Sequence, residues 1–144
     1  MSILCATDFS SQAARALNVA THWARRLGER LMLVHVVSPP PALQHEIAAG
    51  FGTFTDALRE VAEKELAKIA EPLRAEGLQV DVRVTAGAAD GVLASIAAET
   101  RPKLIVLGTH GRKGVRRALL GSVAERTVDA APCPVLVVPE PAIE

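Results

Sequence analysis

A group of glycines and hydroxyl side chains in the last third of the chain has the composition of a phosphate-binding loop. Gly108-Thr109-His110-Gly111 follows a short apolar run, and Gly121-Ser122 comes after a further nine residues. Glycine lets a backbone approach a ligand closely, and free N–H groups at a helix start attract anions. The hydroxyls of Thr109 and Ser122 can donate hydrogen bonds to phosphate oxygens. An ordinary strand-to-helix turn also uses glycines, so composition alone leaves both interpretations open.

A basic cluster lies between the two halves of this motif. Arg112, Lys113, Arg116 and Arg117 fall within six residues that contain no acid. Such a run is usually a solvated face. Because the cluster directly follows Gly111, it could instead supply counter-charge to phosphates, and Arg112 is therefore a candidate site residue.

Other nucleotide-binding motifs are absent. The sequence contains no G-x-x-x-x-G-K-[ST] and no G-x-G-x-x-G, since position 55 is Thr after Gly50 and Gly52. The first apolar run is followed by Asp8-Phe9-Ser10 instead. Asp8 could be a first-turn acid next to a helix capped by Ser10 or Ser11. Its carboxylate could also accept hydrogen bonds from an adenine amine or a ribose hydroxyl.

The histidines and cysteines do not form a recognisable catalytic or metal site. His110 lies in the glycine loop, but no nucleophile or carboxylate can be paired with it from the sequence. His35 is expected in a strand. Cys5 and Cys133 lie in or beside apolar runs, where free cysteines act as small core residues, and two are too few for a disulfide framework or a zinc site. Their redox role is left open.

Two hydrophobic periodicities alternate along the chain. Apolar runs predict strands at 3–6, 31–37, 80–84, 104–107 and 135–138. Helical spacing predicts helices at 11–28, 54–76, 89–100 and 115–131. Residues at this spacing, which should face the core, include Leu17, Ala20, Ala24 and Leu27 of the first helix, Val61 and Leu66 of the second, and Val128 of the fourth. This order predicts a single α/β domain over residues 1–144, a Rossmann-like, doubly wound parallel sheet with helices on both faces. Residues 80–84 alternate between apolar and polar, which favours an edge position.

The overall composition excludes several partners. Sixteen basic and sixteen acidic residues cancel among 144, so nothing attracts the chain generally to nucleic acid or to anionic membranes. Only four aromatic residues are available to stack bases. The longest apolar stretches are strand-sized, and the start lacks the basic segment of a secretory signal. We therefore expect a cytoplasmic protein without membrane contact.

The final strand and one long connection raise further expectations. Prolines flank the apolar residues 135–138, which favours an edge strand, and an exposed apolar edge needs a cover. A second copy of the chain is the simplest cover, so we expect a homodimer through 135–138. The connection 38–53 is long for a compact domain, and is either functional or disordered.

Taken together, these segments resemble the universal stress protein family over nearly the whole chain. The matching segments are Ala6-Thr7-Asp8-Phe9-Ser10, Leu33-Val34-His35-Val36, Leu104 to Gly111, Leu120 to Glu125, and Cys133 to Val138. The resemblance implies strand order 3-2-1-4-5, dimerisation through the final strand, and ATP as the ligand of members with this glycine pattern. ADP or AMP could bind in its place, and a triphosphate would bring Mg²⁺.

The resemblance also implies the site residues. Asp8 and Val36 would contact adenosine, and residues of the glycine motif would surround the ribose and phosphates. The full set is Ala6, Thr7, Asp8, Val36, Leu107, Gly108, Thr109, Gly111, Arg112, Gly121, Ser122 and Val123. Position 124 is Ala where ATP-binding members often carry a hydroxyl residue, which would remove a hydrogen bond of about 1–3 kcal/mol to phosphate.

Three functions remain open at this stage. The resemblance favours a dimeric regulatory protein of the stress response that binds adenine nucleotide, with no catalytic residues. A slow ATPase or nucleotidyl-transfer enzyme is the first alternative, although no base can be placed beside an attacking water. A dimeric scaffold without nucleotide is the second.

Overall fold

The computed structural model of the chain describes residues 1–38, 53–109 and 121–139. Its elements alternate between strand and helix, as the sequence periodicity predicts. In chain order they are β1 (Ser2–Ala6), α1 (Ser11–Leu27), β2 (Arg30–Val37), α3 (Thr53–Ala75), β3 (Val80–Ala86), α4 (Ala89–Thr100), β4 (Leu104–Gly108), α5 (Ser122–Ala130) and β5 (Val135–Val138). The connection at 39–52 lies outside the described residues.

The strands form one parallel sheet of five strands in the order β3-β2-β1-β4-β5. Ile3 of β1 is paired with Leu31 of β2 on one side and with Leu104 of β4 on the other. The predicted fold class and strand order are therefore confirmed. β3, the strand with alternating residues, lies at one edge as predicted, and β5 lies at the other.

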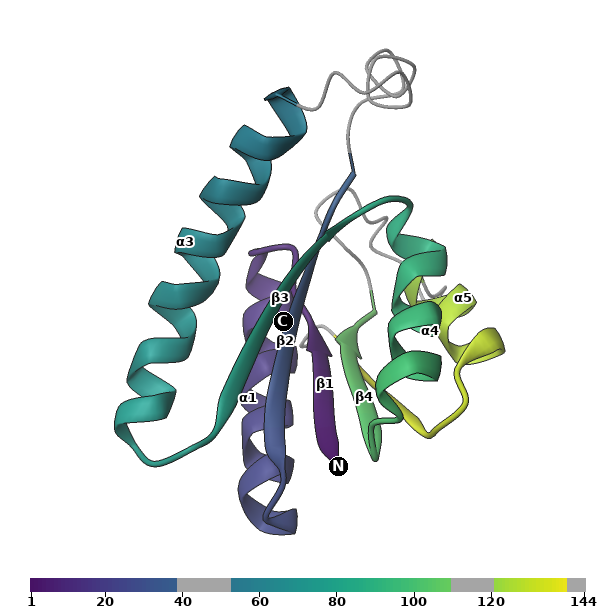
Figure 1. Ribbon diagram of the computed structural model, residues 1–144. Helices are drawn as coiled ribbons and strands as arrows, with labels where there is room; N and C mark the ends of the chain where they lie inside the picture. Colours follow the sequence, from purple (N-terminus) through teal and green to yellow (C-terminus); the bar gives the residue numbers. More distant parts are fainter. Residues whose placement is uncertain (39–52, 110–120, 140–144) are drawn as a thin grey trace, which may run out of the picture.

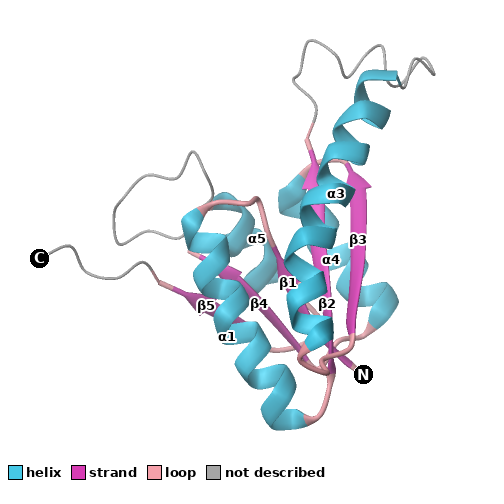
Figure 2. Cartoon of the chain, turned by 90° about the vertical axis from the view of Figure 1, so that its left-hand side faces the viewer, coloured by secondary structure: helices cyan, strands magenta, loops and turns pink. Residues whose placement is uncertain are grey.

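Helices cover both faces of this sheet (Figures 1 and 2). Successive side chains of a strand point to opposite faces. Ile3 and Cys5 of β1 therefore belong to the core cluster under α1 and α3. Leu4 belongs to the second cluster, under α4 and α5. Apart from Ser2, the central strands β1 and β4 contain only apolar residues and glycine, because they are buried on both faces.

Helix α1 begins and ends where its sequence predicts, and the predicted core residues Ala20 and Ala24 are buried. The Ser10 hydroxyl caps it by accepting from the Ala13 N–H at 3.2 Å. Gly28 ends it in a left-handed conformation with φ +67°. The buried face is made of small residues, Ala13, Ala16, Ala20, Thr21 and Ala24. The expectation that Leu27 lies in the core is wrong, because Leu27 is 43% exposed.

Two further helix predictions need correction. The helix predicted over 115–131 begins only at Ser122, because Gly121 has extended backbone angles (φ −67°, ψ 162°). Residues 115–120 lie outside the described part of the chain. Val61 of α3 and Val128 of α5, both predicted to face the core, are exposed. Leu66 of α3 is buried as predicted, and alanines, which carry no strong periodic signal, take further buried positions at 62 and 70.

Candidate functional site

The carboxyl ends of β1 and β4 lie side by side at one edge of the sheet. Cys5 is paired with Val106, so the strands reach this edge together, at Ala6 and Gly108. The strand order reverses here, since the chain runs from β1 to β2 on one side and β4 lies on the other. Such reversal points are where open α/β sheets bind ligands. The structure thus brings Asp8 and Gly108 to the same edge.

The two halves of the glycine motif are joined by backbone hydrogen bonds. Gly121 N–H donates to the Thr109 carbonyl at 2.7 Å, and Thr109 N–H donates to the Val138 carbonyl at 3.2 Å. The intervening residues, with the predicted site residues Gly111 and Arg112, lie outside the described part of the chain. Gly108-Thr109 and Gly121-Ser122 nevertheless form the closed base of one loop.

The start of α5 offers backbone donors at this base. Gly121 is the N-cap and has no side chain to cap the helix. The first helical bond recorded there runs from the Glu125 N–H to the Gly121 carbonyl at 2.9 Å. The N–H groups of Ser122, Val123 and Ala124 precede this bond and have no acceptor within the helix. They form the kind of positive helix end that holds a phosphate.

Gly108 packs beside the first turn of α1. A Cβ built on Gly108 would lie 3.5 Å from Gln12 Cβ and 3.6 Å from Gln12 O, which are ordinary contact distances. Its φ is not in the left-handed range. Neither backbone strain nor a steric clash therefore requires glycine at position 108. The reason for glycine here must be something other than the fold.

The loop between β1 and α1 is tightly hydrogen-bonded. Asp8 Oδ1 accepts from the Ser10 N–H at 3.0 Å, which places the carboxylate at the start of α1. Thr7 Oγ1 accepts from the Phe9 N–H at 3.0 Å, and Thr7 N–H donates to the Val34 carbonyl at 2.9 Å. Thr7 thus acts in shaping the loop, in addition to any contact it makes with a ligand.

The remaining predicted residues differ in what they can offer a ligand. Ala6, Val36 and Val123 are half-buried and pack against the second core cluster. Leu107 is 3% exposed, so only its backbone could reach a ligand. Ala124 is 2% exposed and also belongs to that cluster. Its side chain therefore packs in the core. From the sequence, we considered only the phosphate contact that alanine loses at this position.

Phe9 and His35 are additional residues of this edge that sequence reasoning missed. Phe9 has φ +65°, a conformation that bulky residues rarely adopt. Its ring lies against the imidazole of His35, with centroids 4.5 Å apart. A phenylalanine gives no sequence signal of a left-handed conformation. Neither the φ of Phe9 nor its contact with His35 could therefore have been predicted.

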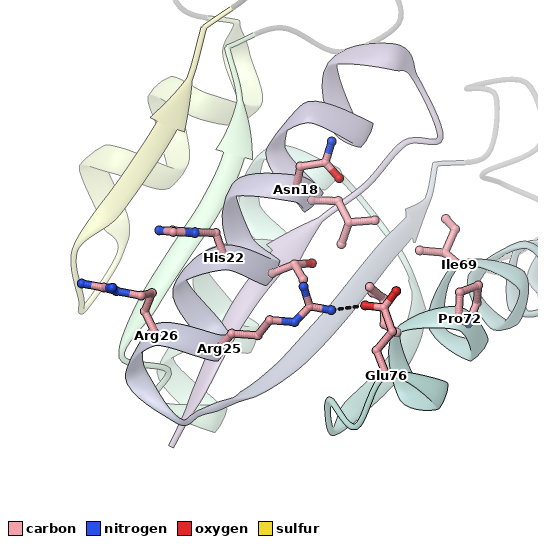
Figure 3. Close-up of a pocket in the computed structure, with 10 residues that line it drawn as sticks. Asn18, His22, Arg25, Arg26, Ile69, Pro72 and Glu76 are labelled. Atoms are coloured by element: carbon pink, nitrogen blue, oxygen red, sulfur yellow. Dashed lines mark hydrogen bonds and ion pairs between the residues drawn. The ribbon is translucent and has the colours of Figure 1, made fainter.

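A hollow of about 530 Å³ lies away from this edge, between α1 and α3. Arg25 of α1 reaches across it to pair with Glu76 of α3 (Figure 3). The Thr21 hydroxyl, in its wall, is buried without a hydrogen-bond partner. The glycine motif is on neither helix, so the hollow is separate from the candidate site.

The cysteines are not poised for chemistry. Complete burial raises the pKa of the Cys5 thiol to about 12, and partial burial raises the pKa of Cys133. Thiols shifted in this direction stay protonated and are poor nucleophiles.

Within residues 1–38, 53–109 and 121–139, no three His, Cys, Asp or Glu side chains could together hold a metal. In the same ranges, no helix is long and apolar enough to cross a membrane.

Comparison with known proteins agrees with the fold. The family model described as "Universal stress protein family" matches residues 1–139. The chain belongs to the universal stress protein family. A universal stress protein of Thermus aquaticus is 34% identical over 142 residues, covering 94% of this chain and 96% of its own. Universal stress protein MJ0531 of Methanocaldococcus jannaschii is 30% identical, covering 96% of this chain and 82% of its own.

Solved structures show the same universal stress protein fold. The hypothetical protein MJ0577 superposes with a TM-score of 0.86 at 27% identity, covering 99% of this chain and 97% of its own. Universal stress protein UspA from Lactobacillus plantarum gives 0.80 at 25% identity, covering 96% of this chain and 97% of its own.

Proposed function

We propose that this universal stress protein binds an adenine nucleotide, ATP in the first place, where β1 and β4 end. In this proposal the phosphates bind at the loop base formed by Thr109 and Gly121 and at the start of α5. The adenosine binds near Asp8 and Val36. The observation that carries the proposal is the Gly121 to Thr109 hydrogen bond, which joins the motif halves beside an uncapped helix start.

The ligand class follows from the donors and acceptors at this edge. Backbone N–H groups and the Ser122 hydroxyl suit a polyanion. A carboxylate such as Asp8 suits a hydroxyl or amine donor, which the adenosine end supplies. Two proteins of the same fold, 22% and 24% identical, were solved with cAMP and dAMP. At that identity they support the fold alone, so the proposal depends on this chain's own residues.

Magnesium would enter the site with the triphosphate. The described residues offer no cluster of acidic ligands. Mg²⁺ commonly binds through phosphate oxygens and water with few protein ligands. We therefore assign the metal to the nucleotide, and we assign the chain a regulatory role in the cytoplasm in preference to catalysis.

We further propose that the protein is a homodimer through β5. β5 is an edge strand, and its residues Val135, Leu136 and Val137 are only half-buried in the single chain. The carbonyls of Pro134 and Val138 accept bonds from Ile105 of β4 and from Thr109, which directly follows β4. The alternate residue Val137 therefore directs its backbone toward the open edge. A second copy could pair with that edge through a two-fold axis.

Calorimetric titration with ATP, AMP and adenosine tests the nucleotide proposal. Asp8→Asn keeps the Oδ1 acceptor for Ser10 and removes the charge, so it should weaken all three ligands alike. Ser122→Ala should weaken ATP more than adenosine, because its hydroxyl serves the phosphates. Ser95→Ala on α4, whose hydroxyl donates to the Gly91 carbonyl of its own helix, is the control. No heat with ATP or AMP at millimolar concentrations would reject the proposal.

Sedimentation analysis tests the dimer. Val137→Pro removes an N–H from the open edge and leaves the bonds to β4 in place. We expect a dimer for the wild type and a folded monomer for the variant. A monomeric wild type, or a variant that remains dimeric, would reject pairing through β5.

A further inference from the structure

A half-buried histidine on β2 is bonded to the loop that carries Asp8. His35 Nδ1 lies 2.8 Å from the carbonyl oxygen of Thr7. A carbonyl oxygen only accepts, so Nδ1 carries the proton and donates. The neutral and the charged imidazole can both make this bond. His35 therefore ties the end of β1 to β2 beyond the strand ladder.

The same imidazole supports a backbone conformation that needs support. Phe9 has φ +65°, and its ring plane is tilted 31° to the His35 ring at a centroid distance of 4.5 Å. A left-handed phenylalanine persists only where its surroundings fix it. Among the described residues, the His35 ring, the first core cluster and the bond from the Phe9 N–H to Thr7 Oγ1 do so here.

Phe9 lies between Asp8 and Ser10, whose backbone N–H holds the Asp8 carboxylate. The Ser10 N–H donates to Asp8 Oδ1 at 3.0 Å and closes a turn over Phe9. If Phe9 left the left-handed region, the Ser10 N–H would turn away from Asp8. The conformation of Phe9 and the position of the carboxylate are thus coupled through one turn.

We propose that His35 is a positioning residue of the nucleotide site. Through the Thr7 carbonyl and the Phe9 ring, it holds the turn that presents Asp8 to the adenosine end of the ligand. This inference rests on the proposed function, because nucleotide affinity is one of its two readouts. The donor and the ring are separable contributions, and each can be removed alone.

Three substitutions separate the contributions. His35→Asn keeps a donor near the position of Nδ1 and removes the ring. His35→Phe keeps a ring and removes the donor, and His35→Leu removes both. We expect amide exchange at Phe9 and Ser10 to accelerate in all three, most in His35→Leu. AMP affinity should fall roughly fivefold for each single loss, the equivalent of one hydrogen bond, and further for His35→Leu.

A matched control distinguishes positioning from general stability. Val80→Ala truncates a buried residue at the start of β3, at the far end of the β2–β3 pair from His35. It should lower the melting temperature while leaving AMP affinity and exchange at Phe9 and Ser10 unchanged. Reduced affinity in this control matching that of His35→Phe would overturn the inference.

The outcomes separate this inference from the proposed function. Unchanged exchange at Phe9 and Ser10 in His35→Phe and His35→Leu overturns the role of His35 without any reference to nucleotide. Faster exchange with unchanged AMP affinity overturns the link to the ligand while the proposed function stands. A wild type that binds neither AMP nor ATP rejects the proposed function and this role together.

Discussion

Gly121 donates its backbone N–H to the carbonyl of Thr109 at 2.7 Å, although eleven residues separate them in the chain. This bond closes the glycine loop at its base. It also fixes the start of α5 beside the end of β4. It therefore places the start of α5, where we propose that phosphates bind, at the edge of the sheet that carries Asp8.

Gly108→Ala should weaken ligand binding while leaving the stability of the fold nearly unchanged. The new Cβ would make ordinary contacts with Gln12, and φ is permissive, so the free energy of unfolding should change by less than about 1 kcal/mol. Ligand binding should weaken roughly tenfold or more, because the methyl group would occupy space between the end of β4 and the first turn of α1, at the edge proposed to bind the nucleotide. Denaturant unfolding and calorimetry measure the two effects.

Gly28→Ala is the matched control for that substitution. Gly28 has open space around its Cβ position but a φ of +67°, so alanine should cost about 1 kcal/mol of stability. Gly28 lies at the opposite end of α1 from Gly108, so nucleotide affinity should not change. If Gly108→Ala lost stability and kept full affinity, the ligand explanation for Gly108 would be wrong.

Thr21→Val should stabilise the protein. The Thr21 hydroxyl is buried in the wall of the α1–α3 hollow without a partner, and an unmade hydrogen bond there costs about 1–3 kcal/mol. Valine has the same shape, so we expect a gain of about 1 kcal/mol in denaturant unfolding. Thr127→Val is the contrasting control, because Thr127 Oγ1 donates to the Val123 carbonyl at 2.6 Å. It should destabilise, and equal effects in both variants would contradict the assignment.

The pH dependence of stability should include a contribution from Glu29. Lys103 donates to its carboxylate at 2.8 Å, and this bond lowers the pKa of Glu29 below its ordinary value of 4.5. A lowered pKa in the folded state means that the contribution is present above the ordinary value and is lost as the pH falls through the folded one. The stability advantage of wild type over Lys103→Met should therefore shrink in acid. An advantage that grew toward low pH would contradict this sign.

The Cys5 thiol should resist alkylation in the folded protein. Its pKa of about 12 leaves almost no thiolate at pH 8, and its side chain is fully buried. With iodoacetamide, peptide mass spectrometry should find Cys133 modified slowly and Cys5 unmodified, with both reacting in urea. Rapid modification of native Cys5 would indicate that β1 opens readily.

Much of the fold could be predicted because it follows from periodicity. Apolar runs alternating with helical spacing leave few topologies, and the alternating residues of β3 mark it as an edge strand. The buried face of α1 could be predicted only in part. Helical spacing placed Ala20 and Ala24 in the core correctly, but it also placed Leu27 there and missed Ala16, because alanine is tolerated both inside and outside.

The candidate site was only partly visible in the sequence. The spacing of Gly108 and Gly121 indicated one loop, and the structure joins its ends. The supporting contacts of His35 were not visible. They depend on the left-handed conformation of Phe9, which arises from tertiary packing and leaves no trace in residue type or spacing.

Mass spectrometry of small molecules released from freshly purified, denatured protein tests the central claim most directly. We expect an adenine nucleotide from the wild type, in an amount that falls strongly for Gly108→Ala and remains unchanged for Gly28→Ala. A wild type that releases none, and that takes up none after incubation with ATP and Mg²⁺, would contradict the account.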